Sequence, residues 1–237
     1  MTSFNLRIYL LISLALFGAS TEFAQSQIVQ NQSAQNQSPR INSLDLLAQF
    51  MKTTQSGVSH FSQVVSSPTQ EGRKAKVKNS EGVFAFSRPN HFRFDYVKPF
   101  VQTIVADGQT LWIYDVDISQ ITARAQDKAL GSTPASLIAS APDLSALEKD
   151  FVLTNEPDLG NLQWVQATPK LKDSQLHFVR IGLSPSADQV SLSKLEILDA
   201  FGQKSVMTFD RFDTNPNRIN ATTFKFTPPQ GVEVIRP

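Results

Sequence analysis

The sequence predicts a mainly β protein, an antiparallel meander of about eleven strands that rolls into a barrel or half-barrel. Short segments with alternating apolar and polar residues follow one another along most of the chain. Turn signals at 107–109, 156–161, 184–189 and 199–203 separate several of them at hairpin spacing. A single interruption, at 131–151, has helical periodicity instead. These observations predict short helices laid on the concave side of one large sheet.

The strands are predicted where alternation coincides with β-branched and aromatic residues. In the segment 91–97, alternation places Phe92, Phe94 and Tyr96 on one face. The predicted strands are 57–65, 75–87, 91–97, 101–106, 109–115, 120–125, 162–168, 176–183, 190–198, 205–212 and 222–226.

An amphipathic helix is predicted before the first strand. Ser43 is the expected N-cap, and Leu44, Leu47, Phe50 and Met51 share one helical face.

The segment at 131–151 predicts two further short helices. Thr133 caps the first, which carries Leu137 and Ile138 on one face. Pro142 ends it, and Asp143 caps the second. Neither helix would be stable alone, so both are expected to lie on the concave side of the sheet.

The N-terminal region predicts export from the cytoplasm. One positive charge precedes an apolar run at 8–19, which is too short to span a bilayer, and small residues follow. We therefore assign 1–26 as a signal peptide, with an uncleaved membrane anchor as the alternative. Residues 27–40 form a Gln/Asn/Ser-rich leader without periodicity, expected to be disordered, and 41–237 form a single domain.

Composition excludes several classes of function. A net charge of +1 over 237 residues argues against nucleic-acid binding, which needs a basic stripe. The absence of cysteine rules out disulfides, thiolate nucleophiles and thiolate metal sites. The 17 phenylalanines, against 2 tryptophans and 3 tyrosines, lack a polar group and must enter a core or an apolar cavity.

No catalytic or cofactor-binding constellation is visible in the sequence. His60, His91 and His177 are scattered without metal-ligand spacing. Asp115 and Asp117 could suggest a metal site, but a polar hairpin turn explains them better. We therefore predict a protein that is not an enzyme and uses no cofactor or metal.

Arg88 is the unusual residue of the strand region. Alternation through 83–88 places its side chain on the same face as Phe84 and Phe86. A guanidinium there needs acceptors for its five donors, and the carbonyl ends of short helices could supply them. The alternative is that Arg88 extends along the strand end into solvent; alternation alone leaves both open.

Four stretches of the chain, taken in order, resemble the LolA family. They are FSRPNHFRFDYVKP, VADGQTLWIYDVDISQITAR, GSTPASLIA and FKFTPPQGVEV. Members of this family carry outer-membrane lipoproteins across the periplasm of Gram-negative bacteria. The resemblance implies an incomplete antiparallel β-barrel, closed by a helical lid over an apolar cavity.

The resemblance also assigns roles to particular residues. Arg88 matches the family's arginine that bonds the lid and holds it shut without cargo, and Phe92 matches an aromatic near the cavity mouth. The residues expected to line the cavity and contact acyl chains are Phe84, Phe86, Phe92, Phe94, Leu137 and Ile138.

The function implied is that of a soluble, monomeric periplasmic carrier. It would bind the acyl chains of lipoproteins released from the inner membrane and deliver them to an outer-membrane acceptor. The implied donor is a LolCDE-type ATP-binding-cassette complex, and the implied acceptor is a LolB-type protein. The alternative is a periplasmic sensor or regulatory domain of the same fold that binds lipoprotein or lipid without delivering it.

Overall fold

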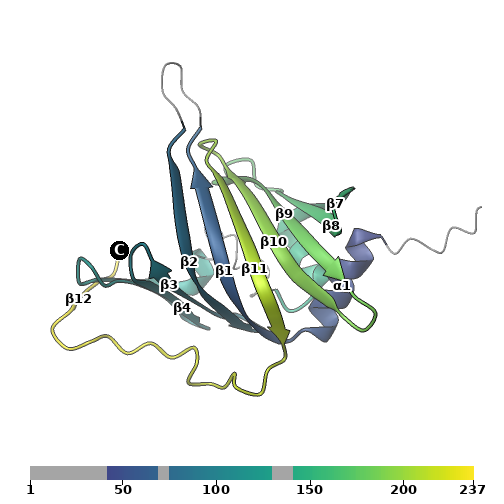
Figure 1. The fold of residues 1–237 in the computed structure, drawn as a ribbon. Coiled ribbons are helices and arrows are strands. Elements are labelled where there is room, and N and C mark those ends of the chain that lie inside the picture. Colours follow the sequence, from purple (N-terminus) through teal and green to yellow (C-terminus); the bar gives the residue numbers. More distant parts are fainter. Residues whose placement is uncertain (1–41, 69–74, 130–140) are drawn as a thin grey trace, which may run out of the picture. The chain divides into compact units, whose positions relative to one another are not determined.

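A single curved sheet dominates the computed structural model, which describes residues 42–68, 75–129 and 141–237 (Figure 1). The described helices are α1 (Ser43–Thr53), α2 (Gln126–Ala129) and α4 (Leu144–Asp150). The described strands are β1 (Ser56–Ser66), β2 (Val77–Ser87), β3 (His91–Lys98), β4 (Gln102–Asp107), β5 (Thr110–Asp115), β6 (Gln120–Ala125), β7 (Phe151–Leu159), β8 (Leu162–Pro169), β9 (Leu176–Pro185), β10 (Val190–Asp199), β11 (Lys204–Thr214) and β12 (Glu233–Ile235).

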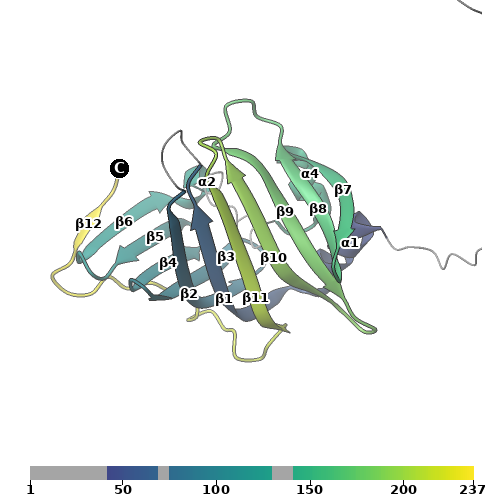
Figure 2. The same cartoon turned by 45° about the horizontal axis from the view of Figure 1, so that its top comes forward.

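The sheet is an open meander. Its strand order is β12-β6-β5-β4-β3-β2-β1-β11-β10-β9-β8-β7, and every pairing is antiparallel except that of β12 with β6. Within the described chain the edge strands β7 and β12 do not pair with each other, so the sheet curves without closing (Figure 2). The predicted fold class, mainly β with an incomplete antiparallel barrel and short helices, is confirmed.

One face of the sheet holds the main apolar core. Helix α1 packs against β7 to β10 and contributes Leu46, Leu47, Phe50 and Met51, all buried. Leu147 of α4 joins the same core, which also takes side chains from β1, β2, β3 and β8 to β11. We refer to this helix-covered side as the concave face. No helix in the described ranges is long and apolar enough to cross a membrane.

The capping residues are partly as predicted. Asp143 caps α4, because its carboxylate accepts a hydrogen bond from the Ala146 N–H. The N-cap of α1 is Asn42 and not Ser43, since the Asn42 side chain accepts from the Asp45 N–H. Ser43 is the first helical residue. Its hydroxyl donates to Asn155 on the edge strand β7, at 2.7 Å, and so ties the helix to the sheet.

One predicted strand is wrong, and two observed strands were not predicted. The segment 222–226 is not a strand: it runs through turns and irregular backbone, because its rings pack onto the opposite face of the sheet instead of pairing. Strand β7 was missed because most of its side chains are polar or exposed, which hides the alternation. Strand β12 was missed because it has only 3 residues.

A second, smaller apolar cluster covers this opposite face. Phe224 is buried there with Ala85 and Val105. Phe226 packs on Trp112, with 5.4 Å between ring centroids. The C-terminal segment after β11 therefore crosses the outside of the sheet before β12 pairs with β6.

Candidate functional site

Strands β2 and β3 bring four of the six predicted lining residues together on the concave face. Phe84, Phe86, Phe92 and Phe94 are all buried, and the Phe84 and Phe94 rings stack at 4.5 Å between centroids. Register explains the contact, because Phe84 pairs with Phe94 and Phe86 pairs with Phe92 across the two strands. Directly paired residues point to the same side of a sheet.

Phe84, Phe86 and Phe92 are packed against neighbouring side chains and do not line an open cavity. They belong to one core with α1, and Phe212 lies 6.0 Å from Phe86 and 6.1 Å from Phe50 between ring centroids. A long apolar ligand could reach Phe84 and Phe86 only after the helices move away from the sheet. Leu137 and Ile138, together with the predicted helix at 133–139, lie outside the described residues.

Arg88, immediately after β2, points inward. It is 8% exposed, and its guanidinium carbon lies 4.7 Å from the centroid of the Phe86 ring and 5.5 Å from that of Phe50. Its backbone N–H donates to the Gln55 carbonyl at the end of α1. The side chain therefore does not extend into solvent, and lies on the side that alternation indicated.

The guanidinium of Arg88 is electrostatically unusual. None of its three nitrogens has a hydrogen-bond partner among the described residues. Burial lowers the pKa of Arg88 to about 10, so the group still carries its charge at neutral pH. The flanking rings offer cation–π attraction, but a ring cannot replace the hydrogen bonds that a buried guanidinium loses on leaving water.

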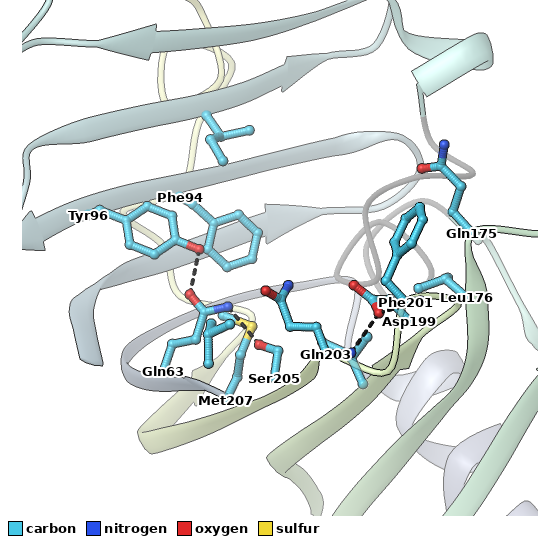
Figure 3. Close-up of a pocket in the computed structure, with 13 residues that line it drawn as sticks. Gln63, Phe94, Tyr96, Gln175, Leu176, Asp199, Phe201, Gln203, Ser205 and Met207 are labelled. Atoms are coloured by element: carbon cyan, nitrogen blue, oxygen red, sulfur yellow. Dashed lines mark hydrogen bonds between the residues drawn. The ribbon is translucent and has the colours of Figure 1, made fainter. Parts of the chain in front are cut away.

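A cavity of about 270 Å³, the inner cavity, opens at the other end of the concave face (Figure 3). Phe94, Ile197 and Met207 supply apolar lining. Figure 3 also shows a hydrogen-bonded row of side chains at this cavity. The Tyr96 hydroxyl donates to Gln63 at 3.0 Å, and the Gln63 amide donates to Ser205 at 2.8 Å. We call these three residues the polar row.

Sequence reasoning missed the polar row. Alternation placed Tyr96 on the face of Phe92 and Phe94, but its partners come from distant parts of the chain. Gln63 lies 33 residues before Tyr96, and Ser205 lies 142 residues after Gln63. The three residues come together through the pairing of β1 with β11 and of β2 with both β1 and β3. No local sequence pattern predicts these pairings.

The acidic pair Asp115 and Asp117 shows no sign of a metal centre. Both lie at the β5–β6 turn, as the hairpin interpretation expects. Within the described ranges no cluster of three or more His, Cys, Asp or Glu side chains could hold a metal ion.

The fold and site define a class of protein: an open antiparallel sheet whose aromatic concave face is covered by short helices and contains a buried arginine. Comparison with known families identifies the member. The model of the family described as "Outer membrane lipoprotein carrier protein LolA" matches residues 52–227. This chain belongs to the LolA family.

Individual relatives agree. A protein of Albidiferax ferrireducens named outer-membrane lipoprotein carrier protein is 55% identical over 193 residues, covering 81% of this chain and 90% of the relative. A protein of the same name from Leptothrix cholodnii is 45% identical over 195 residues, covering 82% and 86%. Among solved structures, a LolA superfamily protein of Nitrosomonas europaea aligns with a TM-score of 0.46 at 11% identity, covering 78% of this chain and 98% of that one.

Proposed function

We propose that this protein is a periplasmic carrier that encloses the acyl chains of lipoproteins released from the inner membrane and delivers them to an outer-membrane acceptor. Its activity would be binding and transfer, without catalysis. The observation that best supports this is the aromatic concave face. Helices cover it, and no disulfide fixes them to the sheet. The proposed donor is a LolCDE-type complex, and the proposed acceptor is a LolB-type protein.

Energetics explain why such a carrier is needed. Each methylene group withdrawn from water contributes ~0.8 kcal/mol, so an acyl chain of about fifteen methylenes represents ~12 kcal/mol. A chain of that kind cannot cross an aqueous compartment exposed. Removing the acyl chain from a membrane costs a free energy of the same size, so the proposed donor must supply energy.

The packed interior explains how cargo can be released again. In the cargo-free protein, Phe50 and Leu47 of α1 are fully buried against the sheet. Entering acyl chains must replace such contacts, and exposing one large apolar side chain costs about 1.5–3 kcal/mol. Net affinity for cargo is therefore smaller than the burial of the chains alone would give. An acceptor that needs no such rearrangement can take the cargo downhill.

We propose Arg88 as a latch in this cycle. Its unfilled donors face the covered side of the sheet, where backbone carbonyls of the predicted helix at 133–139 could accept from them. Closing would then be favoured without cargo, and opening would break those bonds. Each bond from a charged group contributes about 1.5–3 kcal/mol, enough to shift the balance between holding and releasing cargo.

Release from spheroplasts tests the function. Residues 27–237 are purified and added to spheroplasts that synthesise a labelled triacylated lipoprotein. We expect the label to appear in the soluble fraction as a complex with this protein. Absence of soluble label, with a known carrier active in parallel, would contradict the proposal.

Depletion in cells separates a carrier from a sensor of the same fold. Loss of a carrier should leave outer-membrane lipoproteins in the inner membrane, as measured by membrane fractionation. A sensor that binds without delivering would leave their distribution unchanged.

A further inference from the structure

Two cavities on the concave side share the same pair of residues. Gln63 and Tyr96 line the inner cavity, and both also line a second cavity of about 570 Å³. This outer cavity continues to the β3–β4 and β5–β6 turns, where Phe100 and Ile118 are largely exposed. The polar row therefore stands between the two cavities.

The polar row has donors to spare. Among the described residues, nothing accepts from the Ser205 hydroxyl or from the second N–H of Gln63. Burial raises the pKa of Tyr96 to about 12, so its hydroxyl stays protonated and continues to orient the Gln63 amide. The Phe61 ring, edge-on to Tyr96 at 5.1 Å between centroids, holds the phenol in place.

An acyl ester matches this arrangement. Its carbonyl oxygen only accepts hydrogen bonds, and it joins a polar glyceryl group to an apolar chain. Free fatty acid fits less well, because the Asp199 carboxylate lines the inner cavity and Asp115 and Asp117 line the outer one. Lys78 is the one cation among the residues that line the outer cavity, against the two aspartates there. A neutral acceptor avoids repulsion from these carboxylates.

We propose that the polar row binds the ester carbonyl oxygens of a diacylglyceryl group. Gln63 and Ser205 donate to the carbonyls, and Tyr96 positions Gln63. The first methylene groups of the acyl chains lie in the inner cavity beside Phe94 and Met207, and the attached cysteine and peptide leave through the outer cavity. The inner cavity of about 270 Å³ is too small for whole chains, so their remainder enters once the helices move away from the sheet. This inference rests on the proposed carrier function and specifies which part of the cargo this end of the concave face recognises.

The test compares two lipopeptides that differ only in the linkage. One is a dipalmitoyl-glyceryl-cysteine peptide, and the other is its dialkyl ether analogue, which lacks both carbonyls. Wild-type protein should bind the ester about fivefold to thirtyfold more tightly than the ether, the range expected for one to two neutral hydrogen bonds. Ser205→Ala and Gln63→Met should each reduce that preference, because each removes one of the two donors, and should bind the ether as wild type does.

Ser62→Ala is the matched control. Ser62 neighbours Gln63 on β1 and is exposed on the opposite face of the sheet, so its removal should leave the preference intact. If Gln63→Met fails to fold, Ser205→Ala decides the question, because it removes one hydroxyl and leaves a small side chain. A wild-type protein that binds ester and ether equally would overturn the subsite while leaving the carrier function standing.

Further ligands identify the source of the ester. Dipalmitoyl phosphatidylglycerol carries the same diacylglyceryl esters on a phospholipid. If it binds with the same dependence on Ser205 and Gln63, the subsite binds diacylglyceryl esters of phospholipids as well as of lipopeptides. Equally tight binding of palmitate, which has a carboxylate in place of the ester, would overturn ester recognition. Failure of wild type to bind any of these ligands would overturn both the subsite and the carrier function.

Discussion

Arg88 shows what alternation along a strand can and cannot predict. The pattern through Phe84 and Phe86 indicated its side correctly, because a regular strand fixes the direction of each side chain. It could not indicate which groups surround the guanidinium. Phe86 precedes Arg88 by two residues, but Phe50 comes from α1, far away in the sequence, and no hydrogen-bond acceptor is found among the described residues. The latch therefore stays a prediction.

Replacing Arg88 with leucine tests the latch. Arg88→Leu should slow transfer of bound lipoprotein to the acceptor by about tenfold, since removing one charge-assisted bond of ~1.5 kcal/mol from the closed state favours the loaded one. Amide hydrogen exchange in residues 130–150 should become faster in the cargo-free variant. Transfer is measured with purified acceptor, and exchange by mass spectrometry.

Arg124→Leu serves as the control, because Arg124 is exposed on β6. It should change neither transfer nor exchange. Normal exchange at 130–150 together with unimpaired transfer in Arg88→Leu would exclude the latch.

At the scale of elements, the junction between α1 and β1 is held by Asn215, the residue directly after β11. The Asn215 side chain accepts from the backbone N–H groups of Gln55 and Ser56 and donates to the Thr53 carbonyl. With φ of 50°, Asn215 occupies the left-handed region that asparagine tolerates better than most residues. Because Arg88 also bonds Gln55 through its backbone, this junction positions the helix over the concave face.

Asn215→Ala should lower the free energy of unfolding by about 2–4 kcal/mol, because it removes three hydrogen bonds and because alanine tolerates positive φ less well than asparagine does. Asn215→Gly should lose less, since glycine tolerates that backbone, and the difference should be about 1 kcal/mol. Equilibrium denaturation in urea measures both. An alanine variant within about 0.5 kcal/mol of wild type would mean that these bonds contribute nothing net.

Elements also show where sequence patterns fail. The segment 222–226 has the composition of a strand, yet Phe224 and Phe226 pack their rings onto the outside of the sheet. Strand β7 has few buried side chains and was missed, although Asn155 within it anchors α1. Composition indicates that a side chain prefers to be buried, but it does not indicate which strand is available to pair with that segment.

At the scale of the whole molecule, the two faces of the sheet have separate tasks. The concave face carries the proposed cargo site, whereas the C-terminal segment packs Phe224 and Phe226 onto part of the opposite face. Stability and cargo binding should therefore be separable by mutation.

Phe224→Ala should lower the free energy of unfolding by about 3–5 kcal/mol, because it empties a buried site, with Phe224 only 3% exposed. Affinity for lipopeptide, measured well below the melting temperature, should not change. Phe201→Ala is the matched control for stability: Phe201 is 77% exposed, so the effect should stay within about 0.5 kcal/mol. A loss of lipopeptide affinity in Phe224→Ala would show that the two faces are coupled.

The unpaired edges of the sheet have a mechanical consequence. A closed barrel has a circumference set by its strand number and stagger, so it cannot widen without breaking rungs of its ladder. Here β7 and β12 are free of each other, and the curvature can relax while every interstrand bond is kept. Cargoes of different girth could then be accommodated by flattening the sheet, opposed only by the loss of side-chain packing beneath it. The unpaired edges of the sheet would thus let a carrier of this fold change its curvature to suit its cargo.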